Sequence, residues 1–273
     1  MIYELEQGQF YKCEKLVCEE RHVEVRAIVD GTNPGRLFVD DLASPRTAMV
    51  WLGNLDGFGF MGDPANRYFN EHLNTFIDKT IGPEAKVLGL KQFEAFGHHP
   101  VWDDTLQKLF AHRGGNVWTQ NVYKVQNHFK QQGVCLTPPG YRIAPITPEL
   151  LTDASILNAD FGRLKILKFW PSLERFFAKG IGCCVMTRNE IVSLCFSGFV
   201  AGVTHGIDIE TLNEHRGQKL AQAAAHWLAT ECLNRSFLPY WDCTSTNTAS
   251  IAVAERIGFC FDYSYFLHGF RFG

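Results

Sequence analysis

The hydrophobic pattern of the first half of the chain alternates between helical and strand spacing. Some stretches carry apolar residues at helical intervals, whereas others are short β-rich runs bounded by Gly, Pro, Asn or Asp. In order, the pattern predicts a helix at 11–29, strands at 36–40, 47–52 and 57–61, a helix at 65–81, a strand at 87–90, a helix at 102–112 and a strand at 116–125. The consecutive strands with turns between them indicate an antiparallel meander.

The second half repeats this order in outline. We expect a strand at 141–146, helices at 148–157 and 172–179, a hairpin of 181–187 with 191–200, a strand at 204–211, a helix at 218–233, a strand at 238–243, a helix at 248–257 and one or two strands within 261–272. Helices separate the later strands, so the sheet should be mostly antiparallel at first and parallel afterwards. The predicted class is α/β in the α+β sense, a mixed sheet flanked by helices.

A polar and then Pro/Gly-rich segment separates the two halves. Residues 130–141 run from Lys and Gln into a Pro-Pro-Gly turn, a composition that suits a linker between packed units. We place the boundary near Gln132, which predicts two domains at 1–132 and 133–273.

Composition excludes several classes of partner. The 273 residues are 46% hydrophobic and 20% charged with a formal net charge of −3, which is typical of a globular protein. The chain has no Lys/Arg-rich run that would bind a phosphate backbone, so we expect no nucleic-acid partner. No apolar run approaches the roughly 20 residues of a membrane helix. Residues 1–7 also lack a basic leader. We therefore expect no membrane partner and a cytoplasmic location.

The nine cysteines favour free thiols over a metal site. Their number is odd and most lie in apolar segments, as buried thiols do. Cys13 and Cys18 stand five apart, with no second Cys or His pair at zinc-site spacing. We predict that the protein holds no metal.

The stretch 207–221 predicts a phosphate-binding site. It reads as a strand, a short loop with Arg216 and Gly217, and the opening of a helix. A helix N-terminus presents unpaired backbone N–H groups and the positive end of the helix dipole, which together hold phosphate. Strand alternation also places Asp208 and Glu210 side by side on one face of the strand.

Two signatures in the second half resemble the GNAT superfamily of acyl-CoA N-acyltransferases. Arg216 to Ala221 is similar to the pyrophosphate loop of that family, Gln/Arg-x-x-Gly-x-Gly/Ala. Asn247, followed eleven and twelve residues later by Gly258 and Phe259, resembles the second signature of the family. The resemblance covers 141–273 and implies a GNAT fold with acetyl-CoA as co-substrate.

Two shorter segments extend the resemblance over the whole chain. Pro34 to Asp41 and Tyr240 to Cys243 are similar to a bacterial subgroup that includes zwittermicin A resistance-type acetyltransferases. The first half would then be a degenerate GNAT-like domain. Gly62 to Asn66 occupies the place of its phosphate loop, where Asp63 would repel a phosphate.

The resemblance implies a set of cofactor-binding residues. They are Ile209, Glu210, Thr211, Arg216, Gly217, Gln218, Lys219, Leu220, Ala221 and Asn247. Lys219 departs from the family pattern because it replaces the central glycine, although its ammonium suits a diphosphate. Asn247 is equally an ordinary helix N-cap.

Catalysis requires a base for the acceptor ammonium, because only the neutral amine is a nucleophile. Glu210 is the first candidate and Asp208 the second; alternatively, both form a polar strand face paired with Arg or Lys. By similarity, backbone N–H groups near 209–211 would stabilise the thioester oxyanion. Many relatives carry a Tyr acid seven residues after the Asn, where this chain has Ala254. Tyr263 or Tyr265 could replace it.

We therefore expect an N-acetyltransferase that transfers an acetyl group from acetyl-CoA to a primary amine of a small molecule by direct attack in a ternary complex. The alternative is a non-catalytic acyl-CoA-binding or regulatory module, which Ala254 and Lys219 motivate. A homodimer is left open. Cys243 as an acyl-carrying nucleophile is a minor option, and the His98–His99 pair is expected to be solvated.

Overall fold

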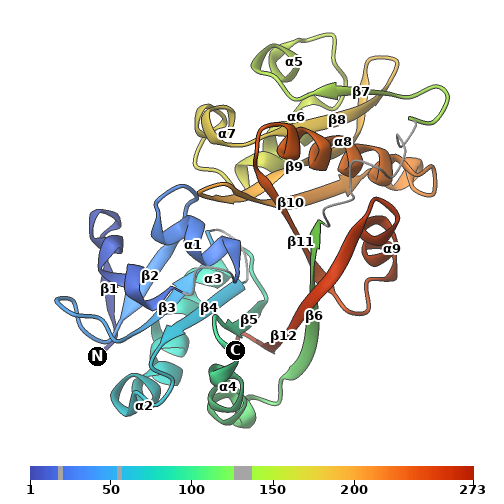
Figure 1. The fold of residues 1–273 in the computed structure, drawn as a ribbon. Coiled ribbons are helices and arrows are strands. Elements are labelled where there is room, and N and C mark those ends of the chain that lie inside the picture. The colour runs from blue at the N-terminus through green and yellow to red at the C-terminus, as the bar shows by residue number, and fades with distance from the viewer. Residues whose placement is uncertain (18–20, 54–56, 126–136) are drawn as a thin grey trace. The chain divides into compact units, whose positions relative to one another are not determined.

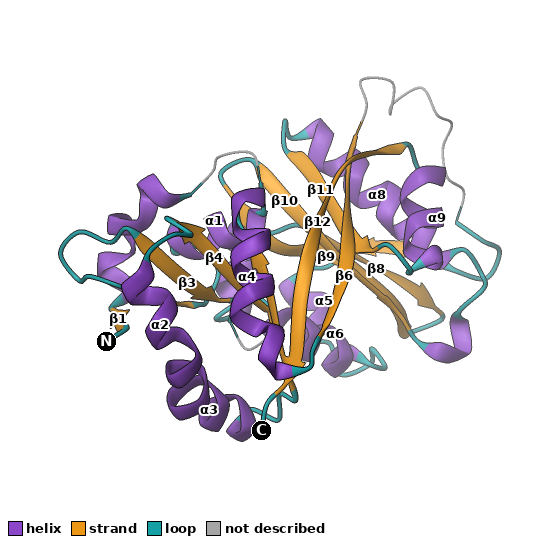
Figure 2. Ribbon diagram, turned by 90° about the horizontal axis from the view of Figure 1, so that it is seen from below, coloured by secondary structure: helices purple, strands orange, loops and turns teal. Residues whose placement is uncertain are grey.

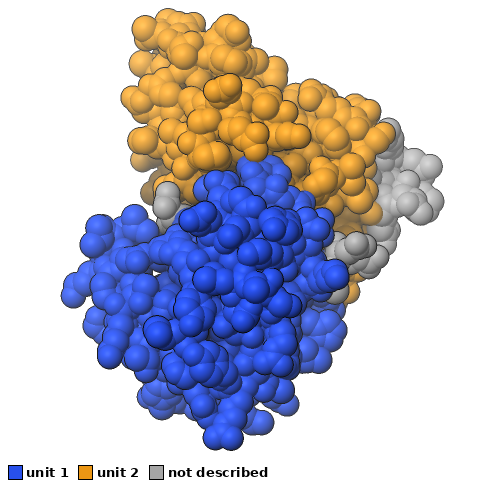
Figure 3. Space-filling view, turned by 90° about the vertical axis from the view of Figure 1, so that its left-hand side faces the viewer, with its two compact units in different colours: residues 1–120, 264–273 blue, residues 121–263 orange. Residues whose placement is uncertain are grey.

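The structure, a computed structural model, describes residues 1–17, 21–53, 57–125 and 137–273 (Figure 1). It divides into two compact units (Figure 3). Unit 1 comprises Met1–Gln120 and Ser264–Gly273, and unit 2 comprises Asn121–Tyr263. The predicted linker around Gln132 falls largely outside the described residues. The placement of a domain boundary there stays a prediction.

Unit 1 is built on a mixed sheet. Its strands are β1 (Tyr3–Leu5), β2 (Arg36–Val39), β3 (Thr47–Trp51), β4 (Gly57–Gly62), β5 (Gln92–Gly97) and the end of β12 (Phe259–Arg271), adjacent in that order. Its helical segments are η1 (Gln7–Leu16), α1 (Val23–Val29), α2 (Arg67–Phe76), η2 (Ile77–Ile81), α3 (Gly82–Val87), η3 (Pro100–Trp102), α4 (Asp103–Phe110) and η4 (Ala111–Arg113). Strands β1 to β4 are antiparallel, as the predicted meander requires, and β5 is parallel to β4.

Side chains that alternate along these strands cover two faces of the sheet. Phe58, Phe60 and Phe93 pack with residues of α2, α3 and α4 in one apolar cluster. Figure 2 shows the ribbons of these helices beside the strands. On the other face, the Cβ position of Gly59 lies against Val25 of α1. The sheet of unit 1 is therefore a middle layer with helices on both sides.

Unit 2 has the same layered construction. Its strands are the end of β6 (Asn116–Val125), β11 (Leu238–Thr244), β10 (Thr204–Thr211), β9 (Glu190–Ala201), β8 (Gly182–Thr187) and β7 (Arg142–Pro145), adjacent in that order, with the start of β12 beside β6. Its helices are α5 (Pro148–Thr152), α6 (Ala159–Leu167), α7 (Leu173–Lys179), η6 (Asn213–His215), α8 (Leu220–Asn234) and α9 (Thr248–Arg256). Strands β7 to β10 are antiparallel, and β11 is parallel to β10.

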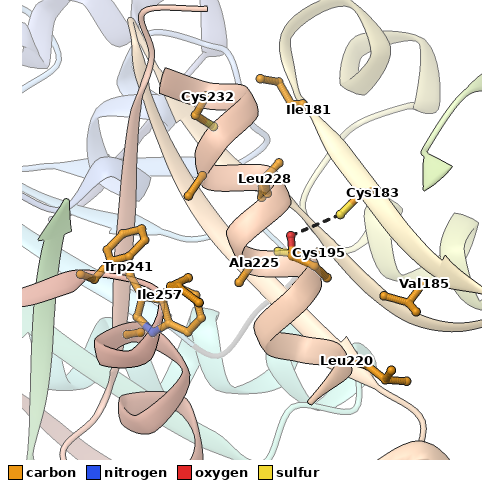
Figure 4. Close-up of a cluster of buried hydrophobic side chains, with 14 of the residues drawn as sticks. Ile181, Cys183, Val185, Cys195, Leu220, Ala225, Leu228, Cys232, Trp241 and Ile257 are labelled. Carbon is orange, nitrogen blue, oxygen red and sulfur yellow. Dashed lines mark hydrogen bonds between the residues drawn. The ribbon is translucent and has the colours of Figure 1, made fainter. Parts of the chain in front are cut away.

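Two apolar clusters hold the layers of unit 2 together. In the first, Leu228 and Cys232 of α8 face Cys183 of β8 and Cys195 of β9, as Figure 4 shows. In the second, residues of α5, α6 and α7 pack against the opposite face of β8 and β9. Because both faces of these strands are covered, their residues are apolar almost without interruption.

Some sequence predictions of local structure were wrong. Residues 7–16 form a 3-10 helix, and the α-helix spans only Val23–Val29. Buried Phe10 and Cys13 are three apart, a spacing that a 3-10 helix places on one face as well. The strand expected at 87–90 is also wrong: Val87 ends α3 with 88% exposure, and the strand begins at Gln92. A short apolar run does not distinguish the end of a helix from a strand.

Two further differences from the sequence predictions concern helix α6 and His98. Helix α6 was not predicted, because Gly162 interrupts its helical pattern. That glycine allows close packing, since a Cβ there would lie 3.0 Å from Leu151. His98 is 1% exposed rather than solvated, because its N–H extends the β4–β5 ladder to Phe60 O at 2.7 Å. Among the described helices, none is long and apolar enough to span a membrane.

Candidate active site

Strands β10 and β11 pair only at their beginnings. The parallel register runs from Thr204 opposite Leu238 to Gly206 opposite Tyr240. Strand β10 then continues to Thr211 and β11 to Thr244, beyond the end of that register. On the other edge of β10, the pairing with β9 shifts between Gly206 and Ile207 at the same level. The register passes over Gly198 of β9 there. The ladder is thus interrupted on one edge of β10 where its pairing with β11 ends on the other, and a gap lies between the two parallel strands.

A cavity of about 580 Å³ occupies the end of this gap. The predicted residues of the site line it together: Ile209, Glu210, Thr211, Arg216, Gly217, Lys219, Leu220, Ala221 and Asn247. Gln218 lines an adjoining hollow of about 470 Å³ with Gly217, Lys219 and Thr137, Pro138 and Pro139. Strand, loop and helix N-terminus therefore meet at one place, as the sequence predicts.

The backbone of β10 presents alternate peptide groups to the gap. Leu212 N donates to Val192 O of β9, and Glu210 O accepts from Ser193 Oγ of β9. Because successive residues of a strand point in opposite directions, the N–H groups of Ile209 and Thr211 point toward the gap. Two N–H groups on the open edge of a strand can donate hydrogen bonds to the carbonyl oxygens of an extended, amide-containing ligand.

The loop after β10 is held in shape by backbone contacts. The 3-10 helix η6 follows the strand, and Arg216 Nε donates to Thr211 O at 3.2 Å. Gly217 has a φ of +78°, which a glycine adopts without strain. Helix α8 then begins at Leu220, and its first turn opens on the cavity. The unpaired N–H groups of a 15-residue helix are thus directed at the site.

Lys219 takes the backbone conformation of the glycine that it replaces. Its φ is +61° and its ψ is +18°, in the left-handed region, and it is the N-cap of α8. A non-glycine residue in this region costs about 1 kcal/mol or more. Lys219 lines both the cavity and the adjoining hollow. The chain therefore keeps a strained residue at this point and gains an ammonium group beside the helix N-terminus.

Asp208 and Glu210 share one lysine. Lys165 Nζ of α6 lies 2.9 Å from Glu210 Oε2 and 3.3 Å from Asp208 Oδ2. The exposed fractions of the side chains are 17% for Lys165, 22% for Asp208 and 40% for Glu210. Only Glu210 of the two carboxylates lines the cavity. The two candidate bases thus differ in their access to the cavity. The Arg or Lys partner that the sequence analysis left unspecified is Lys165.

Burial and charge change the proton affinities in this cluster. Burial raises the pKa of Asp208 above its ordinary value, and Lys165 offsets only part of the rise. Burial alone would lower the pKa of Lys165, but Asp208 and Glu210 together raise it. The lysine therefore stays an ammonium near neutral pH.

Asn247 is a helix N-cap that also lies in the lining of the cavity. Its Oδ1 accepts from Ser250 N at 3.1 Å, which caps α9, and the residue also lines the cavity. Trp241 Nε1 donates to Ser250 Oγ at 3.1 Å, so the cap is tied to β11. The N-cap is therefore fixed to the strand that forms one side of the gap.

The candidate acids and the candidate nucleophile lie elsewhere. Ala254 is fully buried in the core beneath α9. Neither Tyr263 nor Tyr265 is among the residues that line the cavity, and Tyr265 packs on His22 in unit 1. Cys243 belongs to the core, and burial raises the pKa of its thiol. A neutral, buried thiol is a poor nucleophile.

The sequence missed several residues of the site. Lys165 lies on the unpredicted helix α6, so only the two neighbouring carboxylates hinted at a cation. His215 lines the cavity, and its Nδ1 lies 3.0 Å from the Tyr141 hydroxyl, 74 positions away in sequence. Within the described ranges, no group of three or more His, Cys, Asp or Glu residues is placed to hold a metal ion.

Known proteins are similar to this chain in sequence and in fold. The chain is 28% identical over 236 residues to the uncharacterized N-acetyltransferase YdfB of Bacillus subtilis (strain 168), covering 86% of this chain and 85% of YdfB. Its fold is similar to that of a GCN5-related N-acetyltransferase-like protein from Streptococcus suis 89/1591, with a TM-score of 0.68 and 20% identity over 97% and 98% of the two chains.

A second solved structure is similar over the length of both units. It is a tandem GNAT protein from the clavulanic acid biosynthesis pathway, with a TM-score of 0.61 and 12% identity over 100% of this chain and 99% of the other. The profile of the family described as GNAT acetyltransferase matches residues 14–267. Together with the phosphate loop and the parted strands, this match shows that the chain belongs to the GNAT acetyltransferase family.

Proposed function

We propose that this acyltransferase moves an acetyl group from acetyl-CoA to a primary amine of a small molecule, by direct attack of the amine within a ternary complex. The observation that carries the proposal is the cavity between β10 and β11, with the α8 N-terminus at its wall and Glu210 in its lining. GNAT acetyltransferases in general use acetyl-CoA. The zwittermicin-type subgroup stays a hypothesis.

The residues of the cavity suit the parts of acetyl-CoA. The N–H groups at the start of α8, with Lys219 and Arg216 beside them, match a diphosphate in charge and hydrogen bonding. The exposed edge of β10 at Ile209 and Thr211 matches the amide-containing arm of the cofactor. The same N–H groups would polarise the thioester carbonyl and stabilise its oxyanion.

Glu210 would act as the base. An alkyl ammonium of pKa near 10 is only about 0.1% neutral at pH 7, so removal of its proton is the main demand on the protein. Glu210 lines the cavity and is partly exposed. It would therefore reach an entering amine either directly or through one water. The free amine then attacks the thioester carbon and forms the C–N bond, and the C–S bond breaks as the thiolate leaves with the electron pair. The second proton that the nitrogen loses to become an amide passes to the thiolate through solvent.

A dedicated acid for the thiolate is not required by the energetics. A thiol of pKa about 8.5 leaves readily near neutral pH, and protonating it gains at most about 2 kcal/mol. The buried Ala254 is therefore compatible with turnover. Ala254 by itself therefore gives no reason to prefer a module that binds acyl-CoA without catalysis.

We further propose that unit 1 is a degenerate GNAT-like domain without a cofactor site. Its corresponding strands β4 and β5 stay paired from Gly57–Glu94 to Phe60–Gly97, and His98 N continues the ladder. The following helix α2 is capped by Asn66 Oδ1, which accepts from Phe69 N, and Asn66 Nδ2 donates to the Asp40 carboxylate. A closed strand pair and a carboxylate near the helix start disfavour a phosphate-containing ligand.

Replacing Glu210 tests the proposed function. We expect purified protein to release CoA thiol from acetyl-CoA in the presence of a panel of small primary amines, and Glu210→Gln to lower kcat by about 10²- to 10⁴-fold, because the base is lost. Glu214→Gln is the matched control, since Glu214 lies in η6 just after β10, is exposed and is not part of the cavity lining. Equal rates for Glu210→Gln and wild type would remove Glu210 as base. Binding without thiol release across the panel would favour the non-catalytic module.

A further inference from the structure

We propose that Lys165 is a positioning residue of the reaction: its ammonium holds the Glu210 carboxylate at the wall of the cavity, while Asp208 holds Lys165. This inference rests on the proposed role of Glu210 as base. The two carboxylates, which are alternative candidates for the base in the sequence analysis, then have different roles. Glu210 meets the acceptor, and Asp208 acts only through the lysine.

The geometry of the cluster supports this division. Lys165 Nζ is within contact distance of both carboxylates, at 2.9 Å from Glu210 Oε2 and 3.3 Å from Asp208 Oδ2. Exposure increases from Lys165 through Asp208 to Glu210, so the lysine approaches from the protein side and Glu210 remains accessible. An ammonium with several donors can orient two acceptors at once.

Close packing fixes the lysine and Asp208. The Phe169 ring lies 5.8 Å from Lys165 Nζ, in cation–π contact. A Cβ on Gly198 of β9 would lie 3.2 Å from Phe169 and 3.4 Å from Asp208 Cβ, so the glycine lets both approach the strand. A side chain held in this way loses little further freedom when it orients a neighbour.

The charges around Asp208 explain why a lysine is needed. Two carboxylates on one face of β10 repel each other, and without a cation one of them would retain a proton. Lys165 and the exposed Lys168 at the end of α6 supply positive charge from one side. From β9, Cys195 stays neutral, because burial raises the pKa of its thiol well above the ordinary value. Lys165 thus places its positive charge between the two carboxylates, 2.9 Å from Glu210 Oε2 and 3.3 Å from Asp208 Oδ2.

Three variants of the full chain test the proposal by activity. We expect Lys165→Met to raise the pKa on the acidic limb of the pH profile of kcat by about one unit, because the carboxylates lose their cation. At pH 6.5 kcat should then fall severalfold, while the KM for acetyl-CoA stays unchanged. Lys165→Arg should restore much of the profile, since its guanidinium can also bind two carboxylates. Lys179→Met is the matched control, because Lys179 is exposed at the end of α7 and is not among the charges that act on Asp208; it should keep the wild-type profile.

A thermal measurement without acetyl-CoA gives a second readout. Lys165→Met should lower Tm by roughly 2–4 °C, the shift expected for about 1 kcal/mol in a protein of this size. Adding Glu210→Gln should recover part of this loss, because it removes one of two unpaired carboxylates. Two interacting residues give such non-additive changes, whereas independent residues give additive ones.

The outcomes distinguish this inference from the proposed function. A wild-type pH profile for Lys165→Met, or strictly additive Tm changes, would overturn the positioning role and leave the acetyltransferase proposal intact. If Lys165→Met does not fold, Lys165→Gln takes its place, and a wild-type pH profile of that variant would overturn the positioning role. Full activity of Glu210→Gln would overturn both the role of Glu210 and that of Lys165.

Discussion

At the scale of single residues, Lys219 is the clearest departure from the family pattern. It replaces a glycine in sequence but keeps the left-handed backbone of that glycine, with a φ of +61°. Strain of this kind persists where the surroundings or the function require it. The cavity that Lys219 lines indicates function as the reason, because an ammonium there faces the place proposed for a diphosphate.

Replacing Lys219 by glycine should separate strain from binding. We expect Lys219→Gly to leave stability unchanged or to raise it by up to about 1 kcal/mol, because relief of the left-handed strain is partly offset by glycine entropy. The same variant should bind acetyl-CoA several times more weakly, as measured by calorimetry, because one charged contact is lost.

Arg188 offers a matched control for that variant. It also has a left-handed φ, of 51°, and it lies in the turn between β8 and β9 rather than in the cavity lining. Arg188→Gly should change stability in the same direction without changing the affinity. Unchanged affinity in both variants would show that Lys219 makes no contact with the cofactor.

At the scale of elements, α9 joins a structural cap to the candidate site. Asn247 caps the helix, and Trp241 of β11 binds the same first turn through Ser250. Loss of an N-cap side chain costs about 1 kcal/mol. The cap therefore fixes a helix whose residues line the cavity.

Replacing Asn247 should affect both stability and binding. We expect Asn247→Ala to lower the free energy of unfolding by about 1 kcal/mol and to weaken acetyl-CoA binding. Ser172→Ala is the comparison, because Ser172 caps α7 through Arg175 N and is not part of the cavity lining. It should cost similar stability and leave the affinity unchanged. If Asn247→Ala also leaves the affinity unchanged, Asn247 is a cap and not a cofactor contact.

Sequence reasoning located the elements of unit 2 that carry the site but not their contacts. Strand β10, the loop and α8 were predicted nearly as they stand, because alternation, the Arg216–Gly217 loop and the helical stripe are local signals. Lys165 was missed, because its partners are more than 40 positions away and Gly162 obscured its helix. The parting of β10 from β11 after Gly206, and the register shift against β9 at the same level, cannot be read from the alternation of either strand.

At the scale of the whole molecule, the two units resemble each other in layers and differ at one place. In unit 2 the parallel pair β10–β11 parts and leaves a cavity, whereas in unit 1 the pair β4–β5 stays joined through His98. The parted pair is the only one of the two that leaves backbone N–H groups for a ligand. We therefore propose that the cofactor binds in unit 2.

Calorimetric titration of the full chain with acetyl-CoA tests this claim most directly. We predict one molecule bound per chain, with binding lost or severely weakened in Arg216→Glu, because a carboxylate would then face the diphosphate at the α8 N-terminus. Wild-type and variant protein should have matching Tm values without ligand, and only the wild type should gain stability from it, by about 2.7 kcal/mol at 100 times Kd. Absence of binding, two molecules per chain, or undiminished binding by Arg216→Glu would contradict the account.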